Sequence, residues 1–136
     1  MNLEALAEQP YWIIDILPAQ VPPERGNRFF AVEKYFLAPE RLADIKHRHI
    51  SLLLKLSCFR DVTVDGEGET SPAPAHIADR IQRETLLLRA GDALILSEPD
   101  DTHMTVFRPD GELLALIRQL AAAEGLFVWE MPGERC

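Results

Sequence analysis

Cysteine is scarce in this chain of 136 residues, which has only Cys58 and Cys136. So small a number excludes the disulfide framework that stabilises many small secreted domains. We expect a reducing compartment, with Cys58 packed inside a helical segment. Cys136, the last residue, is expected to be a displayed thiol without a catalytic role, because the sequence places no base or cation to activate it.

Long apolar runs are also missing. No stretch approaches the roughly 18 apolar residues of a bilayer-spanning helix. The opening MNLEALAEQ carries acidic residues where a secretory signal peptide needs basic ones followed by an apolar core. We therefore expect a cytoplasmic protein without a membrane segment.

Positive charge is in short supply. The formal net charge is -8, and residues 61–136 hold six Lys and Arg against fifteen Asp and Glu. An acidic surface repels phosphate backbones and anionic lipid, which disfavours general nucleic-acid and membrane-surface binding. A basic partner, or simple solubility, suits this charge better.

Familiar catalytic motifs are absent as well. The sequence contains no GxGxxG, GxxxxGK[ST], GxSxG or HExxH pattern. Dinucleotide binding, P-loop chemistry, serine hydrolysis and zinc proteolysis therefore have no motif to support them. We expect no cofactor and no metal.

The composition that is present is that of a globular domain, with 47% hydrophobic and 26% charged residues. A chain of this mass buries about two thirds of its surface on folding, which is enough for a stable core without disulfides or a structural metal. We expect a single domain over residues 1–136.

Hydrophobic periodicity predicts an α+β fold. Two principal helices are expected at 40–58 and 111–124, and shorter ones over the segments 29–36 and 76–84. The expected strands are residues 11–16, 61–65, 93–97, 103–107 and 126–130. The order favours a mixed or antiparallel sheet around a ferredoxin-like β-α-β-β-α-β core with extra short helices, in which the first and last strands pair antiparallel. A sheet with helices on both faces is the alternative.

The first and last strands are apolar on both faces. Along the first, Tyr11 and Ile13 alternate with Trp12, Ile14 and Ile16. Along the last, Phe127 and Trp129 alternate with Leu126 and Val128. The second face is covered either by the extra helices and the Pro-rich loop or by a partner or a second copy. The candidate interaction surface consists of Tyr11, Trp12, Ile14, Phe127 and Trp129.

Histidine offers one candidate for chemistry. His49 lies midway between Leu42 and Leu56 in an apolar helical stripe, while His47 points to the other side of the helix. We expect His49 to be a buried, mostly neutral core residue. A place in a ligand pocket and a proton-handling role are the alternatives.

A second polar candidate begins the fourth strand, where Asp101 and His103 sit on one face. A carboxylate and an imidazole suit a catalytic dyad or part of a metal site, but two groups are too few for either. The simpler interpretation is that both residues lie in solvent where the hairpin loop meets the strand. The candidate polar site is therefore His49, Asp101 and His103.

Two acidic loops, 65–69 and 98–101, have oxygen ligands that hard cations accept. The first loop lacks the EF-hand register, because its sixth position is Thr70 and its twelfth is His76. We expect both loops to be solvated.

Three segments, YWIIDILPAQVP, VEKYFL and LIRQLAAAEGLFVWEMP, are similar to a family of short, uncharacterised bacterial proteins. The resemblance implies a stand-alone bacterial cytosolic protein and transfers no activity or site. The sequence thus favours a small non-catalytic interaction protein whose partner is another protein or a second copy. The alternative is a small-molecule-binding domain or small enzyme that uses His49 or the Asp101/His103 pair.

Overall fold

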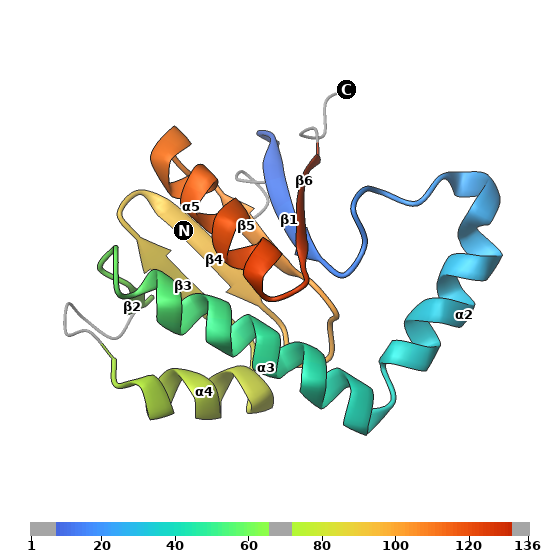
Figure 1. The fold of residues 1–136 in the computed structure, drawn as a ribbon, viewed down its shortest axis with the longest axis horizontal. Helices are drawn as coiled ribbons and strands as arrows, with labels where there is room; N and C mark the ends of the chain where they lie inside the picture. Colours follow the sequence, from blue (N-terminus) through green and yellow to red (C-terminus); the bar gives the residue numbers. More distant parts are fainter. Residues whose placement is uncertain (1–7, 66–71, 132–136) are drawn as a thin grey trace.

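The computed structural model describes residues 8–65 and 72–131 and is built around one antiparallel sheet. Its six strands run in the order β2-β3-β4-β5-β1-β6 (Figure 1). The strand bounds are β1 Tyr11–Asp15, β2 Thr63–Val64, β3 Leu86–Ala90, β4 Ala93–Ser97, β5 Met104–Phe107 and β6 Phe127–Met131. The first strand therefore lies near one edge, between two strands from the end of the chain.

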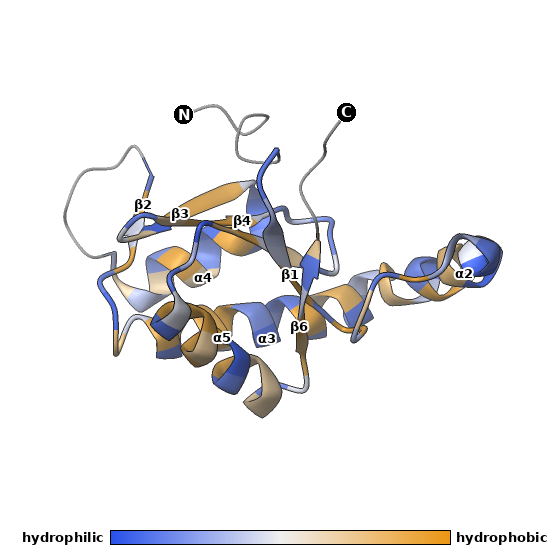
Figure 2. Ribbon diagram, turned by 90° about the horizontal axis from the view of Figure 1, so that it is seen from above, coloured by the Kyte–Doolittle hydropathy of each residue, from blue (hydrophilic) through white to orange (hydrophobic). Residues whose placement is uncertain are grey.

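Three helices cover one face of this sheet, and a fourth projects from the body (Figure 2). The helix bounds are α2 Gly26–Phe36, α3 Pro39–Leu56, α4 Pro74–Arg83 and α5 Gly111–Ala123, with a short 3-10 turn, η1, at Pro23–Arg25. The main core lies between the sheet and α3, α4 and α5. None of the helices in the described ranges has the length and hydropathy needed to cross a membrane.

The two long helices form where the sequence predicts them. In α3, Pro39 stands in the first turn, where its missing N–H costs nothing, and the stripe containing Ile45, His49 and Leu52 is buried. In α5, the side chain of Asp110 caps the helix by accepting a hydrogen bond from the Leu113 N–H at 2.8 Å. These helices present their apolar stripes to the sheet.

The strand register explains the two-faced pattern of the first and last strands. Ile14 lies opposite Val128 on the helix-covered face, while Ile13 lies opposite Trp129 on the other face. We call this second side the outer face. Leu94 and Phe107 are buried there in a small cluster with Tyr11. Both faces therefore carry apolar side chains, as the alternation predicts.

The α+β class, the antiparallel sheet and the pairing of the first and last strands are confirmed. The ferredoxin-like core is not, because the strand order differs and the sheet is extended beyond β4 by β3 and β2. The segment Leu86–Ala90 is not among the expected strands, yet it pairs with Ala93–Ser97 as a hairpin. Helices on both faces are not observed in the described part of the chain, because α3, α4 and α5 cover one face and α2 projects beyond the sheet (Figures 1 and 2).

Two smaller expectations need correction. Cys58 follows α3 and is exposed, so it is not packed in the core. The Pro-rich connection 17–27 was expected to hold no regular element, but Pro23 begins η1 and α2 starts at Gly26. Proline at the first position of such a turn supplies the fixed φ that the turn needs.

Candidate binding groove

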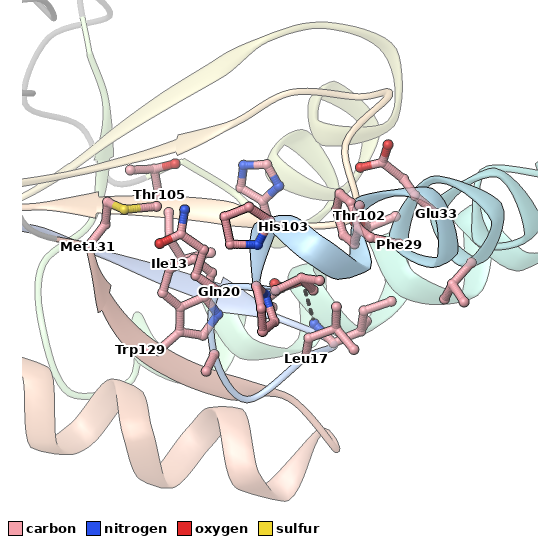
Figure 3. A pocket seen from close by; sticks show the side chains of 18 of the residues that line it. Ile13, Leu17, Gln20, Phe29, Glu33, Thr102, His103, Thr105, Trp129 and Met131 are labelled. Atoms are coloured by element: carbon pink, nitrogen blue, oxygen red, sulfur yellow. Dashed lines mark hydrogen bonds between the residues drawn. The ribbon is translucent and has the colours of Figure 1, made fainter.

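A cavity of about 500 Å³ lies on the outer face, between the sheet and α2 (Figure 3). We call α2 the arm and this cavity the arm groove. The floor comes from β1, β5 and β6, and the walls come from the connection after β1 and from the arm. A volume of this size is typical of sites that hold a small molecule or a few side chains of a partner.

The floor is apolar and aromatic. Ile13, Trp129 and Met131 lie side by side there because antiparallel pairing sets the outward residues of β1 and β6 opposite one another. Tyr11 extends this surface, with its ring 5.7 Å from that of Phe107. Figure 3 shows the floor residues facing into the groove.

The opposite wall is held in place by proline and by the helical period of the arm. Pro22 and Pro23 restrict the backbone that leads into η1 and so direct the chain away from the sheet. Phe29, Val32 and Glu33 then fall on one side of the arm and line the groove. The wall therefore joins a stiff loop to an amphipathic helix.

Asp15 is the most perturbed acid in the arm groove. Burial raises the pKa of its carboxyl group, and the Ile16 N–H, which donates to Oδ1 at 2.8 Å, opposes this rise. His103 and the Trp129 side chain also favour the charged form. The indole Nε1 of Trp129 is nevertheless buried without a hydrogen-bond partner among the described residues. The groove thus holds a desolvated carboxylate and an available N–H donor.

The charge of the arm groove is one-sided. Among the described lining residues, Asp15 and Glu33 carry carboxylates, and none is Lys or Arg. Aromatic rings of Tyr11, Phe29 and Trp129 surround them. Aromatic faces and carboxylates both attract cations, so the lining suits a ligand with an apolar body and a positive charge.

The candidate polar site is divided by the structure. His103 lines the arm groove and also a smaller cavity of about 110 Å³, which Asp101 shares. His49 lines neither: it is fully buried in α3, and both ring nitrogens lack hydrogen-bond partners among the described residues. Burial, then the charge of Lys46, lower its pKa to about 3. The neutral core histidine is therefore the form that this environment favours.

The acidic turn after β4 has its own cation within the chain. Carboxylate oxygens of Glu98, Asp100 and Asp101 lie within 4.8 Å of one another, a spacing that suits a metal ion. The buried Lys46 ammonium donates to the Glu98 carbonyl oxygen and faces these acids. The hydrogen bond that a protonated Glu98 donates to Asp101, together with burial, raises the pKa of Glu98 above its ordinary value. We assign no metal to this cluster.

The other acidic loop, 65–69, lies outside the described residues except for Asp65. That carboxylate accepts a hydrogen bond from the guanidinium of Arg89 at 3.2 Å. It is therefore engaged by β3 of the same sheet.

The candidate interaction surface is split between the two faces of the sheet. Tyr11 and Trp129 line the arm groove, and Phe127 is exposed nearby on β6. Ile14 is fully buried and Trp12 packs against the main core, so these two are core residues on the helix-covered face. The alternation of a strand separates them from their neighbours.

Sequence reasoning missed Asp15 and the arm residues of the groove. The 3.6-residue period of Phe29, Val32, Glu33 and Phe36 was visible, but an equally good period of two competed with it. No local pattern indicated that the arm would stand beside the first strand.

Comparison with protein-family models, with curated proteins and with solved structures gave no match to this chain. The resemblance to short bacterial proteins therefore stays a prediction. The function has to be argued from the groove itself.

Proposed function

We propose that the chain is a small, non-catalytic cytosolic interaction protein that holds an apolar, positively charged segment of a partner polypeptide in the arm groove. The observation that carries the proposal is the lining. Among the described lining residues, Asp15 and Glu33 supply carboxylates, His103 is the one ionisable base, and aromatic rings line the same groove. A basic, apolar segment would bury its side chains on that floor and place its cation beside the carboxylates.

The state of Asp15 supports a cationic ligand. Burial raises its pKa because the carboxylate loses water without gaining a full positive partner. A bound ammonium or guanidinium would supply that partner and lower the pKa. Binding should then release a proton, and affinity should fall as pH drops through the pKa of Asp15 in the free protein.

The extent of the apolar surface favours a polypeptide over a small amine. Beyond the groove, the arm continues with exposed Phe30 and Tyr35. Eleven helical residues span about 16 Å, which is longer than a small amine can cover. A segment of a partner protein can fill the groove and contact the arm together.

Titration with charge-matched peptides tests the proposal. One short peptide alternates Leu and Lys around a central Phe, and its partner replaces each Lys by Glu. We expect the fluorescence of Trp129 to change with the Lys peptide and not with the Glu peptide. The variant Asp15→Asn should weaken binding of the Lys peptide about tenfold and remove its pH dependence. A Trp12→Phe background assigns the signal to Trp129.

The matched control is Asp92→Asn, which removes an exposed carboxylate from the β3–β4 turn, far along the sheet from the groove. It should leave binding unchanged. Equal binding of both peptides, or equal loss in both variants, would overturn the proposal. Phenethylamine serves as the small-molecule probe. If it binds in an Asp15-dependent manner and the Lys peptide does not, the ligand is a small amine.

A further inference from the structure

The arm carries apolar side chains on two sides that lie roughly 100° apart around the helix axis, although none of its residues is buried. One side, with Phe29, Val32 and Phe36, is half-buried toward the groove. The other carries Phe30, which is 65% exposed, and Leu37, which follows the helix and is 37% exposed. Phe30 and Leu37 thus form an apolar stripe on the arm that no other described part of the chain covers.

The arm is also short and attached at its ends. Its main packing partners are η1 before it and α3 after it. The Arg41 guanidinium stacks on the Tyr35 ring at 3.6 Å, and its Nε donates to the Tyr35 carbonyl oxygen at 2.6 Å. This fixes the angle at which the arm leaves α3 (Figure 1). An isolated helix of eleven residues is marginal in water, so the arm needs further contacts to be stable.

The uncovered side of the arm combines apolar side chains with a positive charge, which is the kind of ligand proposed for the arm groove. Lys34 stands between Phe30 and Leu37 on that side, at helical spacings of four and three residues. The arm holds two cations and one acid, whereas the whole chain has a net charge of -8. An apolar stripe with a central ammonium therefore complements a groove with aromatic rings and carboxylates.

We propose that the uncovered side of the arm seats in the arm groove of a second copy, and that the exchange is reciprocal, giving a twofold dimer. The inference rests on the proposed function, since it identifies a particular polypeptide segment, the arm of a second copy, that binds in the groove. A twofold axis makes both contacts from one self-complementary surface, so each chain gives an arm and accepts one. At physiological salt, the screening length of about 8 Å limits the repulsion between two acidic chains.

Sedimentation equilibrium of the whole chain with reductant tests the exchange. We expect a species of twice the 15.4 kDa monomer mass at tens of micromolar protein. Phe30→Glu should raise the dimer dissociation constant at least about tenfold, because it puts a charge on the seated side. The matched control is Phe59→Glu, at a site 68% exposed beyond α3, which should leave the dimer intact.

Mixing two variants, one altered in the groove and one altered in the arm, tests whether the arm of one chain binds in the groove of the other. Thr105→Arg adds a cation to the groove floor, and Phe30→Glu damages the arm. Each variant alone should be monomeric at concentrations where their mixture forms a heterodimer through one intact arm and one intact groove. Circular dichroism and thermal melts confirm that both variants are folded. If the mixture stays monomeric, the arm does not seat in the groove and the proposal falls.

The Lys peptide separates this proposal from the one on which it rests. A wild-type chain that is monomeric but binds the peptide overturns the arm exchange alone. A chain that neither dimerises nor binds the peptide overturns both. A dimer that persists in Phe30→Glu also overturns the exchange.

Discussion

The ammonium group of Lys46, in α3, donates a hydrogen bond to the backbone carbonyl oxygen of Glu98, in the turn between β4 and β5. The lysine is 3% exposed, and three carboxylates of the turn face it. Burial lowers its pKa to about 8. One buried cation thus ties the acidic turn beside the arm groove to the central helix.

The first prediction concerns alkaline stability. The pKa of Lys46 is about 8 in the folded chain and near 10.5 when unfolded, so between these values the unfolded state binds more protons. Its contribution to the free energy of unfolding should therefore rise with pH, by on the order of 2 kcal/mol from pH 7.5 to 10. Urea unfolding should show this rise in wild type relative to Lys46→Met. Lys34→Met, at an exposed lysine on the arm, should follow wild type.

Acid stability gives the second prediction. His49 has a pKa of about 3 when folded and 6.5 when unfolded, so its contribution is complete above pH 6.5 and is lost as pH falls toward 3. Relative to His49→Leu, wild type should lose on the order of 2–3 kcal/mol between pH 7 and 4. Urea unfolding at both pH values measures this difference.

The same variant checks the burial of His49 at neutral pH. Because the ring nitrogens have no hydrogen-bond partner among the described residues, His49→Leu should be tolerated at pH 7. His47→Leu is the control, since His47 is exposed two residues earlier in α3, and it should keep the wild-type loss in acid. An NMR pKa of 6.5 or higher for His49 would contradict the neutral core assignment.

The third prediction compares two glycines with positive φ. Gly125 has φ +75° and Gly91 has φ +63°. Alanine at either should cost roughly 1–2 kcal/mol of unfolding free energy through backbone strain. A methyl group at Gly125 would also lie 2.8 Å from Nη1 of Arg48, which donates to the Glu124 carbonyl oxygen. Because Nη1 is the far end of a flexible, partly exposed side chain, it can shift, so Gly125→Ala should cost only about 0.5 kcal/mol more than Gly91→Ala.

A double-mutant cycle isolates that extra cost. In an Arg48→Ala background, no guanidinium stands in the way of the added methyl group, so Gly125→Ala and Gly91→Ala should become equally costly. Chemical unfolding measures the loss of unfolding free energy caused by Gly125→Ala and by Gly91→Ala, each in the wild-type and in the Arg48→Ala background. A difference that persists without Arg48 would assign the cost to the backbone at Gly125.

The sequence was most informative where one face of an element is apolar and its end is marked. The helix expected at 111–124 is Gly111–Ala123, because Asp110 caps it and its apolar stripe is regular. The strand expected at 93–97 is Ala93–Ser97. The strand Leu86–Ala90 escaped detection, since it has three leucines in a row and no β-branched residue, and it is apolar on both faces.

Strand order and the candidate groove lay beyond local patterns. Both depend on which segments that are distant in sequence pair with each other. The alternating apolar residues of Tyr11–Asp15 are compatible with any apolar strand on either edge, so they do not identify β5 and β6 as its neighbours. His49 could be predicted as a core residue because it stands in an apolar stripe. Asp15 could not be recognised, because the residues that line the groove with it on β5, β6 and the arm are remote in sequence or separated from it by the Pro-rich connection.

The place of β1 in the sheet has a consequence for the order of events during synthesis. Strands β3, β4 and β5 are joined by short turns and can pair as soon as they leave the ribosome. The segment Tyr11–Asp15 is made before the other strands of the sheet, yet its neighbours are Met104–Phe107 and Phe127–Met131, so it must wait until roughly a hundred further residues have been made. Until then a strand with two apolar faces stands unpaired. The nascent chain is therefore most open to aggregation, and to capture by a chaperone, along Tyr11–Asp15.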